Sequence, residues 1–142
     1  MARDIDYKAA FECLPGAAAM LSTDFTILAV SDGYIEAAGR EADELVGRSI
    51  LEAFPENPQD PADTGPSDLR ASLEAVVASR ERDVMGIVRY DVEDLASPGE
   101  FQERYWAIIN TPVCTEDGEL EMIGHCAFEV TQIIRQSQAV NS

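Results

Sequence analysis

The chain has 142 residues, of which 27 are Asp or Glu and 10 are Lys or Arg, so its formal net charge is −17. This length is typical of one domain that can bury a hydrophobic core of its own. A surface this acidic repels the phosphates of nucleic acids and the head groups of anionic membranes, so we expect neither as a partner.

Three cysteines, Cys13, Cys114 and Cys126, lie far apart in the sequence and lack the paired spacing of zinc sites or disulfide frameworks. We therefore expect no metal, and we interpret the cysteines as buried free thiols in a reducing cytoplasm. No signal peptide is recognisable after the first residues, and no apolar run is long enough to span a bilayer. These features predict a cytoplasmic protein.

The first predicted element is a short helix. Four apolar residues follow one another at the i, i+3, i+4, i+7 spacing of one helix face: Tyr7, Ala10, Phe11 and Leu14. This pattern predicts a helical lead-in over residues 4–14, which Pro15 and Gly16 end. We expect this helix to lie outside the main body of the domain.

Two short strands come next, over residues 17–21 and 27–30, joined by the turn-forming Ser22-Thr23-Asp24. Three short helical segments are predicted after them, at residues 32–38, 41–46 and 49–54. Ser31 is a suitable N-cap for the first of these segments, because its hydroxyl can accept a free backbone N–H. Glycines close the first two.

The second half of the chain opens with a proline-rich loop over residues 55–66 and continues with the longest predicted helix. The apolar stripe of that helix consists of Leu69, Leu73, Val76 and Val77. Three longer strands joined by hairpins follow, at residues 84–92, 101–113 and 120–130. Because the helices lie between two groups of antiparallel strands, this order predicts an α+β fold.

The alternation of side chains along a strand allows the faces to be assigned. In the last strand the more apolar set is expected to face the core: Leu120, Met122, Gly124, Cys126, Phe128 and Val130. The opposite set, which includes Ile123 and His125, is expected to be partly solvated. In the first long strand, one face is assigned to Val84, Val88, Tyr90 and Val92.

The middle long strand is apolar on both sides, with Tyr105 and Trp106 on opposite faces. A sheet covered on one side only would show a cleaner alternation of apolar and polar residues. We therefore expect the outer face to be covered, by the first helix or by a second copy of the domain.

A series of short strings in this chain resembles those of a PAS domain. They are Ser31-Asp32-Gly33-Tyr34, Gly47-Arg48-Ser49-Ile50, Phe54-Pro55-Glu56-Asn57-Pro58, Leu69-Arg70-Ala71-Ser72-Leu73, Arg89-Tyr90-Asp91-Val92, Arg104-Tyr105-Trp106, Asn110-Thr111-Pro112-Val113 and Glu129-Val130-Thr131. The last string departs from the family pattern, since Glu129 stands where many PAS domains have Asp. The resemblance rests on the order and spacing of the strings and covers residues 11–131.

The resemblance implies a five-stranded antiparallel sheet with short helices and one long helix on one face. It also implies a single domain over residues 1–131 and a linker over residues 132–142 that leads toward an output domain absent from this chain. PAS domains sense small molecules, redox state or light, or they dimerise, beside histidine kinases and other output domains. We therefore expect a homodimeric sensor or regulatory module of bacterial signal transduction, such as a two-component system.

A ligand pocket, where one exists, should lie between the core face of the sheet and the helices. Its expected walls are Ile50, Phe54, Leu69, Leu73, Val76, Trp106, Ile108, Asn110, Met122, Cys126 and Phe128. The alternative that these side chains simply fill the core stays open. The expected interface residues are Tyr7, Phe11, Leu14, Ile123 and His125.

No cofactor is assigned. Haem-binding PAS domains often carry a His on the long helix, and flavin-binding ones carry an Asn-Cys-Arg string; this chain has neither. Its one histidine, His125, is placed beside Glu121 and Glu129, where it could titrate near neutral pH and act as a switch.

Three functions remain to be compared. The first is a sensory module that binds a small molecule in its core, and the second is a docking or dimerisation module without a ligand. The third is a small enzyme with a cone-shaped α+β fold, which would need a buried acid–base pair. Because no catalytic motif is present, we expect no enzymatic activity.

Overall fold

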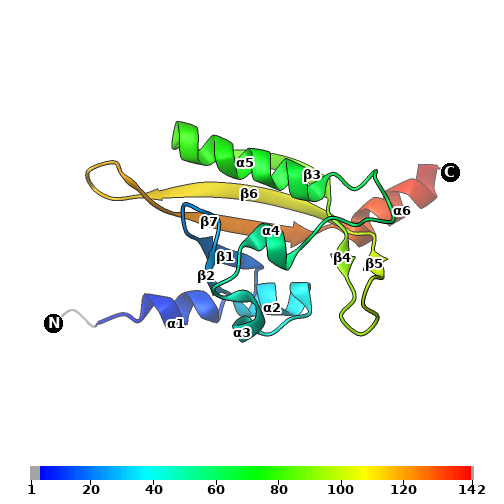
Figure 1. Ribbon diagram of the computed structural model, residues 1–142, viewed down its shortest axis with the longest axis horizontal. Coiled ribbons are helices and arrows are strands. Elements are labelled where there is room, and N and C mark those ends of the chain that lie inside the picture. The colour runs from blue at the N-terminus through cyan, green and yellow to red at the C-terminus, as the bar shows by residue number, and fades with distance from the viewer. Residues whose placement is uncertain (1–3, 142) are drawn as a thin grey trace.

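The computed structural model describes residues 4–141 and is built around a five-stranded antiparallel sheet in the order β2-β1-β7-β6-β3 (Figure 1). The strands are β1 (Ala18–Leu21), β2 (Ile27–Val30), β3 (Asp83–Arg89), β6 (Tyr105–Cys114) and β7 (Leu120–Glu129). β1 therefore pairs with both β2 and the last strand β7, which joins the chain's two halves into one sheet. The predicted α+β fold is confirmed.

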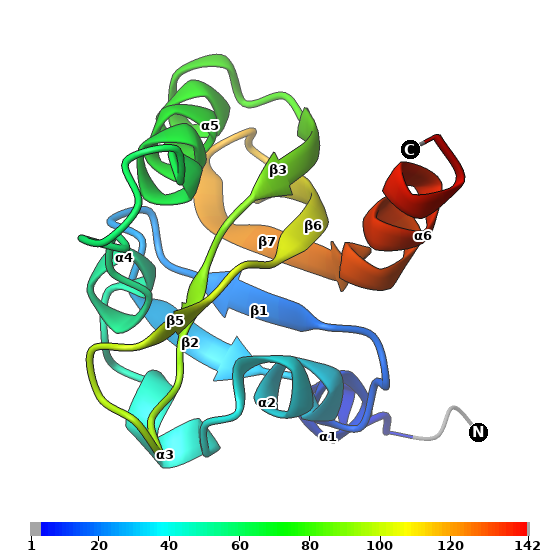
Figure 2. The ribbon, with the colours of Figure 1, turned by 90° about the vertical axis from the view of Figure 1, so that its right-hand side faces the viewer.

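The helices between the two groups of strands cover the inner face of the sheet. They are α2 (Asp32–Ala38), α3 (Ala42–Leu45), α4 (Ile50–Ala53) and the long α5 (Gly65–Ser79), which packs on β3 and β6. Figure 2 shows α4 and α5 on one side of the sheet and α6 (Thr131–Asn141) on the other. The Ser31 hydroxyl caps α2 by accepting the N–H of Tyr34 at 3.2 Å, and Gly39 closes that helix at φ 68°.

The first helix, α1 (Tyr7–Glu12), lies at the edge of the sheet beside β2 and buries none of its residues. The stretch predicted as a linker forms α6, which contacts β6. None of the helices within residues 4–141 is long and apolar enough to cross a membrane. Residues 1–3 and 142, which the sequence assigns to the domain and to the linker, lie outside the described residues.

The first long strand differs from its prediction in two ways. It ends at Arg89, and the next residues form a separate ladder in which β4 (Val92–Glu93) pairs with β5 (Phe101–Gln102). Within β3 the register shifts between Val84 and Gly86, and Gly86 has a positive φ of 74°. This bulge moves Met85 and Val88 onto the same core while Val84 is exposed, so the predicted grouping of Val84 with Val88 is wrong.

The faces of β7 are also reversed from the prediction. Ile123, His125 and Ala127 are buried, whereas Phe128 is 51% exposed. The register explains this, because residues paired across antiparallel strands share a face. Asn110 of β6 faces the core and pairs with His125, so that set of β7 turns inward.

Candidate functional site

A cavity of about 50 Å³ lies between the inner face of the sheet and the helices α2, α4 and α5. Its aromatic walls are Tyr34, Phe54, Tyr90 and Trp106. None of the described residues that line it is Asp, Glu, Lys or Arg. A preformed apolar cavity with few polar groups is the usual form of a small-molecule site.

Hydrogen bonds and ring contacts hold the aromatic walls in place. Trp106 Nε1 donates to the carbonyl of Tyr90 at 2.9 Å, and the Tyr90 hydroxyl donates to the carbonyl of Phe54 at 2.6 Å. Tyr34 meets Phe54 edge on, with ring centroids 6.0 Å apart. These contacts join α2, the end of α4, the end of β3 and β6, so the walls come from segments far apart in the sequence.

His125 is the most polar residue of the cavity lining. It is 3% exposed, its ring lies 6.1 Å from that of Tyr34, and its Nδ1 is 2.7 Å from Oδ1 of Asn110. Burial lowers the pKa of His125 from 6.5 to about 4, because charging the ring away from water is costly. The histidine is therefore neutral at pH 7, and its predicted roles at an interface and as a switch near neutral pH are wrong.

Burial acts in the opposite direction on the tyrosines of the cavity. It raises the pKa of the Tyr34 and Tyr90 hydroxyls well above 10, since the phenolate would have to be charged in an apolar environment. Both hydroxyls stay protonated across the physiological range. The cavity thus presents neutral polar groups only.

Five of the predicted wall residues line this cavity: Ile50, Phe54, Leu69, Trp106 and Ile108. Three others, Leu73, Val76 and Asn110, are buried in the core without lining it. The prediction is wrong for Met122, Cys126 and Phe128, which lie on the outer face of β7. The reversed face of that strand accounts for all three.

Several cavity residues were not predicted. The sequence offers Tyr34 and Tyr90 as parts of the strings that resemble PAS domains and not as pocket walls, and Ala127 belongs to the set of the last strand that is expected to be partly solvated. Tyr34 could have been found from its position three residues after the N-cap Ser31, on the turn of α2 next to the sheet. No local signal identifies His125, because its burial depends on the pairing of β7 with β1 and β6.

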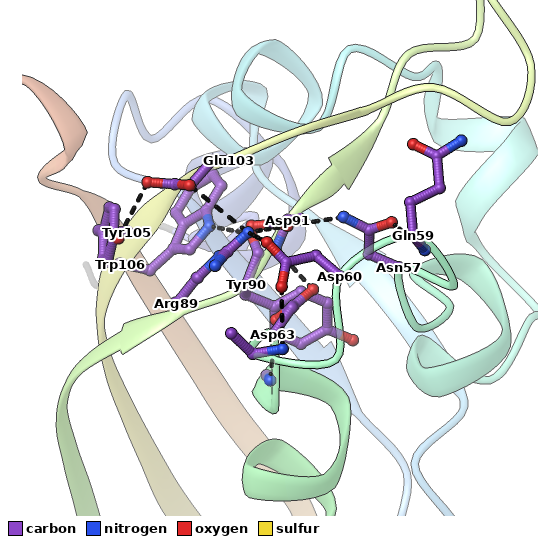
Figure 3. A network of polar contacts seen from close by, with 12 residues as sticks. Asn57, Gln59, Asp60, Asp63, Arg89, Tyr90, Asp91, Glu103, Tyr105 and Trp106 are labelled. Atoms are coloured by element: carbon purple, nitrogen blue, oxygen red, sulfur yellow. Dashed lines mark hydrogen bonds and ion pairs between the residues drawn. The ribbon is translucent and has the colours of Figure 1, made fainter.

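A network of ion pairs lies beside the cavity, at the end of β3 (Figure 3). Arg89 donates from Nε and Nη2 to the two oxygens of Asp91, at 2.9 and 2.8 Å. Its Nη2 also lies 2.7 Å from a carboxylate oxygen of Asp60 and 3.5 Å from one of Glu103. The hydrogen bonds that Arg89 donates to Asp91 and then to Asp60 raise its pKa, and it stays charged.

Asp91 is the buried centre of this network, since it is only 1% exposed. Asn57 Nδ2 donates to its second oxygen at 2.8 Å, and its own backbone N–H donates to Asp63 at 3.1 Å. Burial raises the pKa of Asp63, which also accepts the N–H of Gly65 at the start of α5. The network therefore fastens the proline-rich loop to β3 beside Tyr90, which is a wall of the cavity.

Arg40 is a buried cation close to the cavity, whereas Arg89 is partly exposed. Its Nη1 donates to the carbonyl of Ala53, and its guanidinium lies 5.0 Å from the centre of the Phe54 ring. Its Nε has no hydrogen-bond partner among residues 4–141. Burial, which disfavours the charged guanidinium, is the main reason that the pKa of Arg40 is lowered. Arg40 supports the Phe54 wall from the side away from the cavity.

The outer face of the sheet is apolar and open within the described part of the chain. Phe128 of β7 pairs with Ala107 of β6, which pairs with Ile87 of β3. Phe128 and Ile87 are exposed, so α1, one of the two covers expected from the sequence, does not cover this row, and a second copy remains the other. A parallel row joins Cys126, Ile109 and Val84.

The predicted interface residues are divided by the structure. Tyr7 and Leu14 are exposed, and Phe11 is partly buried. Ile123 and His125 lie in the core, so their assignment to an interface is wrong.

The prediction that all three cysteines are buried also fails. Cys13 and Cys114 are exposed, and Cys126 is intermediate. Among residues 4–141, no group of three His, Cys, Asp or Glu side chains could hold a metal ion.

Comparisons with known proteins agree with this architecture. A family model described as the PAS fold matches residues 11–134. No curated protein matches the chain.

Three solved structures illustrate the likeness. An RNA-binding light-oxygen-voltage receptor has a TM-score of 0.71 at 14% identity, over 95% of this chain and 34% of that one. A PAS domain from Colwellia psychrerythraea has a TM-score of 0.67 at 14% identity, over 87% of this chain and 93% of that one. A sensory box sensor histidine kinase from Vibrio cholerae has a TM-score of 0.56 at 21% identity, over 88% of this chain and 89% of that one. Identities this low carry the fold alone.

Proposed function

Because this chain belongs to the PAS-fold family, we propose that it is a signal-sensing module of a larger regulatory protein and that it binds a small molecule in the cavity. The observation that carries the proposal is the cavity itself. It has apolar aromatic walls, no charged lining residue and a neutral histidine. Binding there would alter the contacts of Trp106 and His125, which belong to the two central strands β6 and β7.

The experiment uses the single tryptophan of the chain, Trp106, which lines the cavity. A library of small neutral compounds is screened by the shift in melting temperature, and hits are titrated while the Trp106 fluorescence is recorded. We expect a hit to raise the melting temperature and to change the fluorescence with the same dissociation constant. A screen in which no compound does both would count against the proposal.

A matched pair of variants assigns the binding to the cavity. Ala127→Val adds two methyl groups to a lining residue of β7 and should abolish binding by filling the space. Val84→Ala changes an exposed residue of the outer face and should leave the affinity unchanged. Equal loss of affinity in both variants would indicate that the compound binds elsewhere.

We further propose that two copies of the module pair through the outer face of the sheet. The two rows that contain Ile87 and Val84 carry no charge, although the chain as a whole carries −17. An uncharged apolar patch is the place where two such acidic chains approach with the least repulsion, and patches of this kind mark interfaces. Sedimentation should show a dimer that Ile87→Asp dissociates. A wild-type monomer at high micromolar concentration would contradict this part of the proposal.

The family and the acidic surface support a further part of the proposal, that the module works in the cytoplasm beside an output domain. We propose no enzymatic activity for it. Burial makes His125 a weak base, and no Ser, Thr, Cys, Lys, Asp or Glu lines the cavity among residues 4–141.

A further inference from the structure

A chain of hydrogen bonds leads from the edge of the domain to the cavity and involves four elements of the fold. Ser72 of α5 lies 2.5 Å from a carboxylate oxygen of Asp83, at the start of β3. Asn110 of β6 donates from Nδ2 to the Ser72 oxygen at 2.8 Å, and its Oδ1 lies 2.7 Å from Nδ1 of His125 in β7. Asp83 is partly exposed, whereas Asn110 and His125 are buried.

The direction of every bond in this chain follows from its first member. A carboxylate can only accept, so the Ser72 hydroxyl must donate to Asp83. The Ser72 oxygen then accepts from the amide group of Asn110, which turns the Asn110 carbonyl toward His125. A carbonyl also only accepts, so the proton of the neutral imidazole is on Nδ1, and Nε2 is left with a lone pair.

This lone pair belongs to a side chain that lines the cavity, and it has no hydrogen-bond partner among residues 4–141. The Tyr34 hydroxyl, on a second lining side chain, makes no hydrogen bond within residues 4–141 either. Neither atom is sealed off, since the buried side-chain nitrogen or oxygen without a partner among residues 4–141 is Arg40 Nε, so a molecule in the cavity can reach them. The cavity therefore has one vacant acceptor and one vacant hydroxyl.

Resting on the proposed function of the cavity, we propose that its ligand is a small uncharged molecule whose O–H or N–H donates to Nε2 of His125. An ionised ligand is excluded because no described lining residue carries a charge to compensate it. A ligand that only accepts would leave Nε2 unpaired. The volume of about 50 Å³ limits it to a few non-hydrogen atoms unless side chains move.

The first test needs no variant. Long-range ¹⁵N–¹H spectra of the full chain at pH 7 report which ring nitrogen of His125 carries the proton. We expect the Nδ1-protonated form. A predominant Nε2-protonated ring, or a charged ring, would overturn the proposal.

The second test uses four probes of nearly equal size: isopropanol, acetone, acetate and isopropylammonium. Each is titrated while the signals of the His125 ring and the Trp106 indole are followed. We expect isopropanol to bind about fivefold more tightly than acetone, which is the usual effect of one hydrogen bond, and the two ions not to bind. If acetone or an ion bound as tightly as isopropanol, the inference about the ligand would fail while the cavity remained a binding site. If no probe perturbed either signal, both the inference about the ligand and the proposed function of the cavity would fail.

Asp83→Asn tests whether Asp83 sets the donor-to-acceptor direction of the hydrogen bonds. The amide that this substitution introduces can donate to Ser72, so the whole chain of hydrogen bonds can reverse and the proton of His125 can move to Nε2. We expect the Nε2-protonated fraction to rise and the preference for isopropanol over acetone to fall at least about threefold. Asp117→Asn, in an exposed turn, is the control and should change neither readout. An unchanged tautomer in a folded Asp83→Asn protein would contradict the role assigned to Asp83.

Discussion

The two faces of the sheet are built from the same three strands but have opposite relations to water. The inner face of β3, β6 and β7 is closed by α2, α4 and α5 and holds the cavity. The outer face has nearly as many apolar side chains, yet Val84, Ile87 and Phe128 are exposed. The comparison shows that apolar side chains occur both in a closed core and on a surface that could bind a partner. The two can be told apart only by whether the side chains are buried.

The largest difference in stability between the two faces should be seen when one residue of β7 is truncated on each face. Ile123→Ala removes a fully buried side chain from the inner face and should cost about 3 kcal/mol of unfolding free energy. Phe128→Ala removes a larger side chain from the outer face and should cost less than about 1 kcal/mol in the monomer. Urea denaturation at low protein concentration measures both. Equal costs would mean that the outer face is also covered.

A second comparison concerns the two carboxylates that bind Arg89. Asp91→Ala removes the buried carboxylate that binds both Arg89 and Asn57, and leaves Arg89 only its more exposed partners, so we expect a loss of about 3 kcal/mol. Asp60→Ala removes the partner whose side chain is 41% exposed, and the loss should stay below about 1 kcal/mol. Thermal denaturation of the two variants tests this order. A reversed order would show that Asp91 does not anchor the loop.

The burial of His125 in the inner face should also make the stability of the protein depend on pH. The unfolded chain takes up this proton near pH 6.5, whereas the folded protein takes it up only near its lowered pKa of about 4. The unfolded state therefore binds more protons in between, and stability falls as the pH is lowered through this window. We expect His125 to contribute a loss of about 2 kcal/mol from pH 7 to pH 5.

Denaturation curves of the wild type and of His125→Gln over that pH range isolate the contribution, since the carboxylates titrate in both proteins. The His125→Gln protein should show the shallower pH dependence. Parallel curves would mean that His125 is hydrated in the folded state.

The smallest effect is expected on the outer face. Ile87→Ser replaces an exposed apolar side chain and should change the stability of the monomer by less than about 0.5 kcal/mol. The same variant should weaken the proposed dimer at least about tenfold in sedimentation equilibrium, which corresponds to the loss of one buried apolar contact in each copy. A stability loss above about 2 kcal/mol would place Ile87 in the core instead.

The order of the elements could be predicted because each depends on local chemistry. The Ser31 cap, Gly39 at the end of α2, and the stripe of Leu69 and Leu73 all act over a few residues. The same local patterns identified the cavity residues on α4, α5 and β6, including Phe54 and Trp106. For the helices α4 and α5 one face is clearly more apolar than the other, so periodicity alone assigns it, whereas β6 is apolar on both faces.

The tertiary structure decided what periodicity could not. The outer set of β7 is more apolar than the inner one, so a period of two favoured the wrong face, and the pairing of His125 with Asn110 decided the right one. The bulge at Gly86 likewise changed the faces of β3 in the middle of the strand. The composition, charge and element order of this protein follow from its sequence. The neutral histidine in the cavity follows from the strand register, because burial of that ring depends on side chains 15 or more residues away.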